Sequence, residues 1–468
     1  MQPWLNDACS LADAIRRGEV QSADAVEASL EAIAASKLNA VSYLDAEGAR
    51  RAAEEIDRRV ASGEDPGLFA GVPMLMKDVH DVAGMPTTHG SILYKDNVAE
   101  RDCTQVARLR AAGAVIVGKS TMSEFGLVAY TATKAYGVTR NPWNLERTPA
   151  GSSGGSSAAV AGGLVPIASG GDGGGSIRIP AAYTGLVGMK GTFGRIPRGP
   201  RARNGPLTQH GGPLARTVRD VARWYDVTSG YDAHDPFSLP RIDGWERDLG
   251  TRELHGLRVA VAPGLGRIML EPEVERVVTD AADALIEATG MRRVEATYEA
   301  PDRTERWANA GAPSLFSDLK DFWPGCKDDL TYEIAFSMGW LVEHYRVWHP
   351  ASVDKYRMEV NEAFAETFEQ TDILLCATNP HEPFAAEGPM PAYIGDVRVG
   401  RGHNGSLTIP GNITGYPAIS IPAGLTKNGL PVGLQAYARR HEDALLLDLA
   451  LVMERVRPWP LVAPGAPV

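Results

Sequence analysis

The hydrophobic positions in the N-terminal segment, residues 1–64, recur with helical spacing. One predicted helix carries Val26, Leu30 and Ile33 on a single face, at i, i+4 and i+7. Ser22 precedes this set and is predicted to cap the helix, because a serine oxygen accepts hydrogen bonds from the free N–H groups of a first turn. We therefore predict a helical layer over this segment.

From about residue 70 onward, short apolar runs alternate with helical segments, which is typical of α/β proteins. The runs are rich in β-branched residues and are continuous rather than alternating, so the sheet is expected to be buried on both faces. The predicted strands are Val72–Met76, Ala114–Val117, Leu164–Ala168, Leu257–Ala262, Asp372–Cys376, Ala418–Pro422 and Leu430–Tyr437.

The segment 300–400 differs from the rest in its aromatic content. It holds four of the nine tryptophans, at positions 307, 323, 340 and 348. One interpretation is a variable insertion that covers the core and the substrate. The other is an ordinary helical subdomain that packs through its aromatic side chains.

Composition and charge exclude several classes of function. The 468-residue chain has a net charge of −11 and no basic block, so a nucleic-acid partner is not expected. The four cysteines show no paired spacing, and no apolar run is long enough to span a membrane. We expect a cytoplasmic protein. The ten histidines show no ligand spacing, so neither a metal nor another cofactor is expected.

Two short motifs match known signatures but lack the structural context of those signatures. Residues 113–120 fit the phosphate-loop pattern, yet the residues between its glycines have the composition of a strand. Residues 151–155 fit the Gly-x-Ser-x-Gly pattern of α/β-hydrolases, with Ser153 as nucleophile. That pattern needs a preceding strand, whereas residues 141–149 have the composition of a loop. We predict neither a phosphate site nor a nucleophilic Ser153.

One lysine and two serines are not explained by folding alone. Lys77 ends an apolar strand, Ser152 lies in the Gly/Ser run 151–156, and Ser176 closes the glycine run 170–176. Glycine is tolerated at this density where backbone N–H groups must approach another atom closely, as in an oxyanion hole. A serine nucleophile needs a neighbouring base. Because no histidine is suitably placed in the sequence, a neutral lysine is the remaining candidate.

These motifs resemble those of the amidase signature family, whose members hydrolyse amide-type bonds. The resemblance is strong over 65–240 and 405–460, and 250–400 is variable in the family. It implies a single domain over 1–468, with an α/β/α sandwich around a large twisted mixed sheet, a catalytic core at 65–240 and a C-terminal return to the core at 405–468. The matching residues are Lys77-Asp78, Gly151–Ser156, Asp172–Ala182, Gly188-Met189-Lys190, Gly415–Pro422 and Leu430–Gln435.

The resemblance also implies a Ser–cis-Ser–Lys triad. Ser176 would be the nucleophile, Ser152 the bridging serine and Lys77 the base. The peptide bond between Gly151 and Ser152 would be cis. The oxyanion hole would be formed by the backbone N–H groups of Gly173, Gly174, Gly175 and Ser176.

Neighbouring residues are expected to support this site. Asp172 would brace the loop by accepting backbone or serine hydrogen bonds, and Arg178 would brace Asp172 or Ser153. Gly173 departs from the family, which more often has Thr, Ile or Ser at this position. Gly191 replaces a frequent proline.

The proposed base sets an expectation for pH. An unperturbed lysine has a pKa of about 10.4, so Lys77 would be charged at neutral pH. Burial away from carboxylates can lower a lysine pKa by up to ~3–5 units. Activity is therefore expected to rise into mildly alkaline pH.

The leading functional hypothesis is a hydrolase that acts alone on small amides, with carbamates and esters left open, through an acyl-enzyme. The aromatic segment favours apolar or aryl substrates. Four arginines in the run 195–203 would either bind a polar substrate group or form a solvated loop. The alternative is the glutaminase subunit of a tRNA-dependent amidotransferase. An inactive binding protein is disfavoured because all three triad positions are present, and a homodimer is left open.

Overall fold

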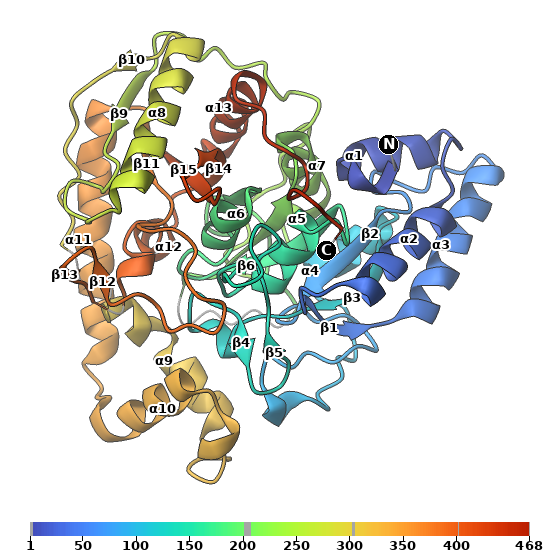
Figure 1. The fold of residues 1–468 in the computed structure, drawn as a ribbon, viewed down its shortest axis with the longest axis horizontal. Coiled ribbons are helices and arrows are strands. Elements are labelled where there is room, and N and C mark those ends of the chain that lie inside the picture. The colour runs from blue at the N-terminus through green and yellow to red at the C-terminus, as the bar shows by residue number, and fades with distance from the viewer. Residues whose placement is uncertain (1–2, 201–206, 302–304, 401, 468) are drawn as a thin grey trace.

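The structure, a computed structural model, describes residues 3–200, 207–301, 305–400 and 402–467. Its centre is an eleven-stranded sheet in the order β1-β3-β2-β6-β8-β7-β14-β15-β11-β9-β10 (Figure 1). The strands of this sheet are β1 (Val41–Leu44), β2 (Pro73–Lys77), β3 (Val115–Ser120), β6 (Ile167–Asp172), β7 (Val187–Lys190), β8 (His210–Ala215), β9 (Arg258–Val261), β10 (Arg292–Arg293), β11 (Ile373–Ala377), β14 (Ala418–Leu425) and β15 (Pro431–Ala438).

The sheet is mixed. Strand β2 runs parallel to both β3 and β6, whereas β8 is antiparallel to β6 and β7. Every residue of β2, β3, β6, β11 and β15 is buried, so the expectation of a sheet covered on both faces is confirmed. The predicted fold class, an α/β/α sandwich around a large mixed sheet, is confirmed as well.

Helices cover the sheet along its whole length (Figure 1). Helix α13 packs against α7 and α8, and both α8 and α13 contact the strands β14 and β15. Helix α7 contacts β8, and α5 packs against β6 and α6. The helices are α1 (Ala8–Arg16), α2 (Ser22–Ala35), α3 (Ala46–Ala61), α4 (Thr104–Ala111), α5 (Gly154–Ala161), α6 (Arg178–Thr184), α7 (Val218–Thr228), α8 (Pro272–Thr289), α9 (Glu305–Leu319), α10 (Tyr332–His344), α11 (His349–Gln370), α12 (Ile409–Thr414) and α13 (Asp443–Val456).

The N-terminal layer differs from its prediction in two respects. Ser22 is the first residue of α2 rather than its cap, and its buried hydroxyl donates to the Gly71 carbonyl. The cap comes from α3, where the Asp57 carboxylate accepts the N–H groups of Ser22 and Ala23 at 2.7 and 3.0 Å. The layer is also not helical throughout, because β1 joins the sheet antiparallel to β3.

All seven predicted strands are present, but one of them is displaced. We predicted a strand over Leu164–Ala168, whereas β6 begins at Ile167 and continues through two glycines to Asp172. The extension is set by pairing with β8, in which Asp172 faces His210. This strand ends directly before the glycine loop that leads to Ser176.

Only part of the segment 300–400 forms a hydrophobic cluster apart from the main core. A separate hydrophobic cluster is formed by α9, α10 and the turn between them, around Leu319, Ile334 and Met338. In Figure 1 these two helices lie at one corner of the molecule. By contrast, α11 packs into the main core and β11 pairs with β9 and β15 inside the sheet. Within the described residues, no helix combines the length and apolar character needed to cross a membrane.

Candidate active site

Two parallel strands bring the predicted lysine to the glycine loop. Lys77 is the last residue of β2 and Asp172 is the last residue of β6, and the two strands are neighbours. Because parallel strands end at the same edge of a sheet, the Lys77 side chain reaches the loop after β6. Its Nζ donates to the Gly171 carbonyl at 3.0 Å and to the Ser152 Oγ at 2.7 Å.

Ser152 lies in the loop that enters α5. The Gly151–Ser152 peptide bond is cis, as the resemblance implied. A Cβ on Gly151 would lie 2.6 Å from the Ser123 Oγ and 2.7 Å from the Val128 carbonyl, so only glycine fits here. No strand precedes the neighbouring Ser153, which confirms that residues 151–155 lack the structural context of the Gly-x-Ser-x-Gly pattern of α/β-hydrolases.

Ser176 ends the loop after β6 and is half-buried, while the five residues before it are buried. Its hydroxyl forms no hydrogen bond to Ser152 or Lys77 among the contacts of the described residues. Gly175 has a φ of 127°, and a Cβ there would lie 2.3 Å from the Thr408 Oγ1. This position requires glycine both for its backbone conformation and for the close approach of Thr408.

The loop N–H groups are not equivalent. The Gly175 N–H donates to the Asp172 Oδ1 at 2.7 Å, so it is already used within the loop. Among the described hydrogen bonds, none uses the N–H of Gly173, Gly174 or Ser176. Three of the four predicted oxyanion donors therefore remain available to a ligand.

A buried ion pair supports the loop from behind. The Arg178 Nε lies 3.0 Å from the Asp172 Oδ2, and both side chains are fully buried. Burial raises the pKa of the Asp172 carboxyl, but the Arg178 guanidinium and hydrogen bonds from Arg178 and Asn412 outweigh it and hold the pKa below its ordinary range. Of the two predicted partners for Arg178, the structure selects Asp172 rather than Ser153.

The rest of this support comes from the C-terminal return to the core. The Arg178 guanidinium donates to the Asn412 Oδ1 at 2.6 Å and to the Gln435 Oε1 at 2.8 Å. The Asn412 Nδ2 also donates to the Asp172 carbonyl at 2.9 Å. Gln435 ends the family-like motif Leu430–Gln435. Asn412 does not stand out in the sequence, because an isolated polar residue more than 200 positions away carries no local signal.

The charge state of Lys77 follows from its burial. Desolvation lowers the pKa of the Lys77 ammonium from 10.5 to about 7, and the Asp172 carboxylate opposes this shift. The carboxylate is itself paired with Arg178, so it stabilises the ammonium little. A substantial fraction of Lys77 is therefore neutral at physiological pH.

Two histidines lie at this edge of the sheet, and among the described hydrogen bonds neither contacts the Lys77 Nζ. The His210 Nδ1 lies 3.3 Å from the Asp172 carbonyl oxygen, and burial holds the pKa of His210 well below its ordinary value. The His80 Nδ1 lies 2.9 Å from the Ser169 Oγ, which also accepts the Lys77 backbone N–H at 2.8 Å. Burial, followed by the charges of Lys77 and Lys119, lowers the pKa of His80 to about 3. Its imidazole positions Ser169 and the end of β2.

The arginine run has a structural role where it is described. Arg195 pairs with the buried Asp443 at 3.2 Å, and Arg198 pairs with the buried Asp235 at 3.1 Å. Arg201 and Arg203 lie outside the described residues. Neither described arginine reaches the Lys77 site.

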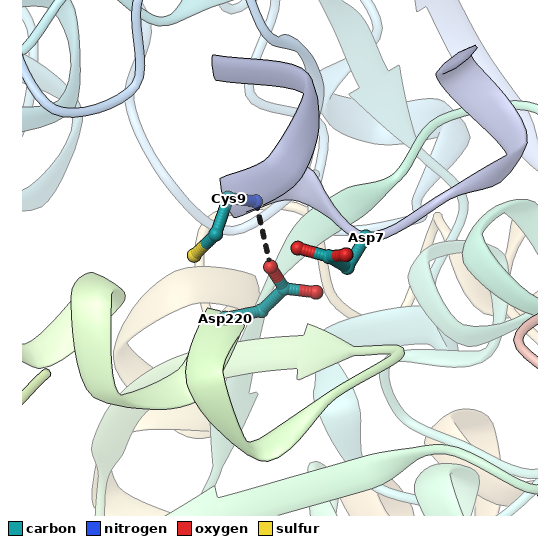
Figure 2. A group of neighbouring side chains, drawn as sticks. All are labelled: Asp7, Cys9 and Asp220. Atoms are coloured by element: carbon teal, nitrogen blue, oxygen red, sulfur yellow. Dashed lines mark hydrogen bonds between the residues drawn. The ribbon is translucent and has the colours of Figure 1, made fainter. Parts of the chain in front are cut away.

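One group of metal-type ligand atoms exists among the described residues, and it lies elsewhere. Atoms of Asp7, Cys9 and Asp220 come within 4.8 Å of one another where α1 meets α7 (Figure 2). Asp220 accepts the Cys9 N–H at 2.9 Å, and burial followed by the Asp7 charge raises the pKa of Asp220 to about 7. The charge of the buried Arg216 acts on both Asp220 and Asp7 and offsets part of their negative charge.

Comparison with known proteins identifies the family of the chain. Residues 24–447 match the amidase family. The chain belongs to the amidase signature family. An acylamidase from Rhodococcus erythropolis is 36% identical over 465 residues, covering 97% of this chain and 96% of the relative. A glutamyl-tRNA(Gln) amidotransferase component from Roseiflexus sp. (strain RS-1) is 34% identical over 492 residues, covering 97% of each chain.

A solved amidase signature structure shares the whole fold. A bacterial aryl acylamidase superposes with a TM-score of 0.92 at 28% identity, covering 98% of each chain. This protein is therefore an amidase-type hydrolase that acts on C–N bonds.

Proposed function

We propose that this amidase hydrolyses small amides through an acyl-enzyme on Ser176, with Ser152 and Lys77 as the proton relay. The observation that carries the proposal is the contact of Lys77 with Ser152. A lysine with a pKa of about 7 donates to a serine hydroxyl at 2.7 Å, beside a glycine loop with unused N–H groups. A weak nucleophile, a neutral base and preorganised donors are the parts that acyl transfer needs.

In acylation, the Ser176 Oγ attacks the amide carbon as its proton passes to the Ser152 Oγ. The Ser152 proton passes at the same time to the neutral Lys77 Nζ. The oxyanion is stabilised by the N–H groups of Gly173, Gly174 and Ser176, while the Gly175 N–H stays on Asp172. The C–N bond then breaks, and the leaving amine takes a proton back from Lys77 through Ser152.

Deacylation repeats the relay with water in place of Ser176. Water attacks the acyl carbon, and its proton passes through Ser152 to Lys77. When the C–O bond to Ser176 breaks, the same route returns the proton to the Ser176 Oγ. The products are the carboxylic acid and a free enzyme with Lys77 neutral.

Small apolar or aryl amides are the proposed substrate class. The support is the similarity to proteins described as an acylamidase and an aryl acylamidase, together with an aromatic side chain on the loop, where the Trp307 Nε1 lies 2.7 Å from the Gly173 carbonyl oxygen. Carbamates and esters have the same carbonyl with a leaving heteroatom, so they belong in the test. The test is a panel of amides, anilides, carbamates and esters. The wild type should hydrolyse members of the panel, and the Ser176→Ala variant should hydrolyse none of them.

The second candidate is glutamine hydrolysis with ammonia transfer to a partner. It is favoured by the relatives described as glutamyl-tRNA(Gln) amidotransferase components, which are nearly as similar as the acylamidase. The purified chain, assayed alone, separates the two. Turnover of an anilide without ammonia release from glutamine supports the amidase proposal, and the opposite result supports the glutaminase.

A further inference from the structure

The glycine loop is held through its carbonyl groups. Each carbonyl from residue 172 to residue 175 accepts a hydrogen bond from a different donor. The four pairs are Asp172 with the Asn412 side chain (2.9 Å), Gly173 with the Trp307 indole (2.7 Å), Gly174 with the Thr408 hydroxyl (2.6 Å) and Gly175 with the Ile179 N–H (2.7 Å).

Three of these donors come from buried residues, and one comes from a half-buried residue. Asn412 and Thr408 lie in or next to α12, and Ile179 lies in α6, all of them buried. Trp307 is in the first turn of α9, is half-buried and packs against the main core, whereas the later part of α9 belongs to the separate hydrophobic cluster. The Gly173 carbonyl is therefore the one loop carbonyl whose donor comes from the aromatic segment.

The orientation of one candidate oxyanion donor depends on this contact. In a trans peptide unit the C=O and the following N–H point in opposite directions. An indole that holds the Gly173 carbonyl therefore turns the Gly174 N–H away from Trp307. Gly173 has no side chain to restrain this unit, and glycine has wide backbone freedom. A hydrogen bond to a carbonyl also polarises the amide and strengthens its N–H as a donor.

The ring itself packs on the loop. A Cβ on Gly174 would lie 2.6 Å from the Trp307 Cζ2, so the indole occupies the space that a side chain at 174 would need. On the other side, a Cβ on Gly173 would lie 2.6 Å from the Gln209 Nε2. The two glycines are thus enclosed between Trp307 and Gln209.

We propose that Trp307 is a positioning residue for the oxyanion hole. Its indole N–H fixes the Gly173–Gly174 peptide so that the Gly174 N–H faces the developing oxyanion, and it makes turnover depend on the docking of α9. This inference rests on the proposed function of Ser176. It assigns to one residue of the aromatic segment a role in transition-state stabilisation.

The test is Trp307→Phe, which keeps an aromatic ring and removes the hydrogen-bond donor. Trp340→Phe is the matched control, because Trp340 packs in the separate hydrophobic cluster of α9 and α10 and does not contact the glycine loop. For each variant, kcat and KM are measured on the best substrate of the panel, together with the Ki of phenylboronic acid. Boronic acids form a tetrahedral adduct with a serine nucleophile and place an oxygen in the oxyanion hole.

We expect Trp307→Phe to lower kcat about tenfold, the factor that one lost neutral hydrogen bond produces. The Ki of phenylboronic acid should rise by a similar factor. KM, the pH midpoint of kcat and the melting temperature should match those of Trp340→Phe. An unchanged kcat and Ki, or a rise in KM alone, would overturn the proposal.

The Ser176→Ala variant separates a failure of the proposed function from a failure of the role proposed for Trp307. If Ser176→Ala retains activity or binds phenylboronic acid like the wild type, the proposed function fails and the inference fails with it. If Ser176→Ala abolishes both while Trp307→Phe behaves like the wild type, only the role of Trp307 is wrong.

Discussion

The Nζ atom of Lys77 lies 2.7 Å from the Ser152 Oγ and takes part in no ion pair of the described residues. Lys119, at the end of the neighbouring strand β3, is equally buried but lies 3.4 Å from the Asp78 carboxylate. Both lysines are desolvated, and only Lys119 has a carboxylate partner. This difference is what leaves Lys77 available as a neutral base.

The first prediction concerns pH. Because burial lowers the pKa of Lys77 to about 7, the neutral form increases as the pH rises through that value. We expect kcat/KM to fall tenfold per pH unit well below about 7 and to level off above it. Lys77→Ala should remove activity over the whole range. A profile that is flat between pH 5 and 9, or an active Lys77→Ala variant, would contradict the role of Lys77.

The two adjacent serines provide a matched pair of variants. Ser152→Ala removes the hydroxyl that contacts Lys77, and we expect a loss of about 10²–10⁴ in kcat. Ser153→Ala removes a buried hydroxyl whose contact is with Gly171 at 3.4 Å, and activity should stay near that of the wild type. Steady-state kinetics at saturating substrate compares them. A larger loss of kcat in Ser153→Ala than in Ser152→Ala would favour Ser153 as the nucleophile instead.

The Asp172–Arg178 pair should be important for stability. Both side chains are fully buried, so removing one partner leaves a charge without compensation. We expect Arg178→Met or Asp172→Asn to lower the free energy of unfolding by about 3–5 kcal/mol. The double variant should lose less than the sum of the two single variants. Urea denaturation measures these values, and additive losses would show that the two residues act independently.

Asp220, which lies beside Asp7 where α1 meets α7, predicts a pH effect on stability. Burial raises the pKa of Asp220 from 3.8 to about 7, so the folded state binds one more proton than the unfolded state between these values. The stability of the wild type should therefore fall as the pH rises through this window. Asp220→Asn should gain on the order of 2 kcal/mol relative to the wild type between about pH 5 and pH 8. If the difference between the two proteins is the same at both pH values, Asp220 does not titrate in this window.

Local patterns in the sequence were sufficient for the core strands and pointed to three side chains, whose catalytic roles stay predictions from the family resemblance. Continuous apolar runs mark β2 and β3 because these strands are buried on both faces. Ser152 and Ser176 stand out because the glycine-rich runs around them have no role in filling a core, and Lys77 stands out because it ends an apolar strand. The cis bond before Ser152 was expected from the resemblance alone.

Long-range contacts could not be predicted in the same way. Strand β8 has the sequence His-Gly-Gly-Pro-Leu-Ala and becomes a strand only because β6 and β7 flank it. The cap of α2 comes from Asp57 in another helix, so the local pattern favoured Ser22 instead. Trp307 carried no signal beyond the aromatic content of its segment, because its contact with Gly173 spans 134 positions.

Covalent labelling tests the central claim, that Ser176 is the nucleophile, most directly. The wild type, Ser152→Ala and Ser176→Ala are treated with a fluorophosphonate, and the adduct is located by peptide mass spectrometry. This role of Ser176 predicts one adduct on Ser176 in the wild type, slower formation of the same adduct in Ser152→Ala, and none in Ser176→Ala. An adduct on Ser152 or Ser153, or undiminished labelling of Ser176→Ala, would contradict it.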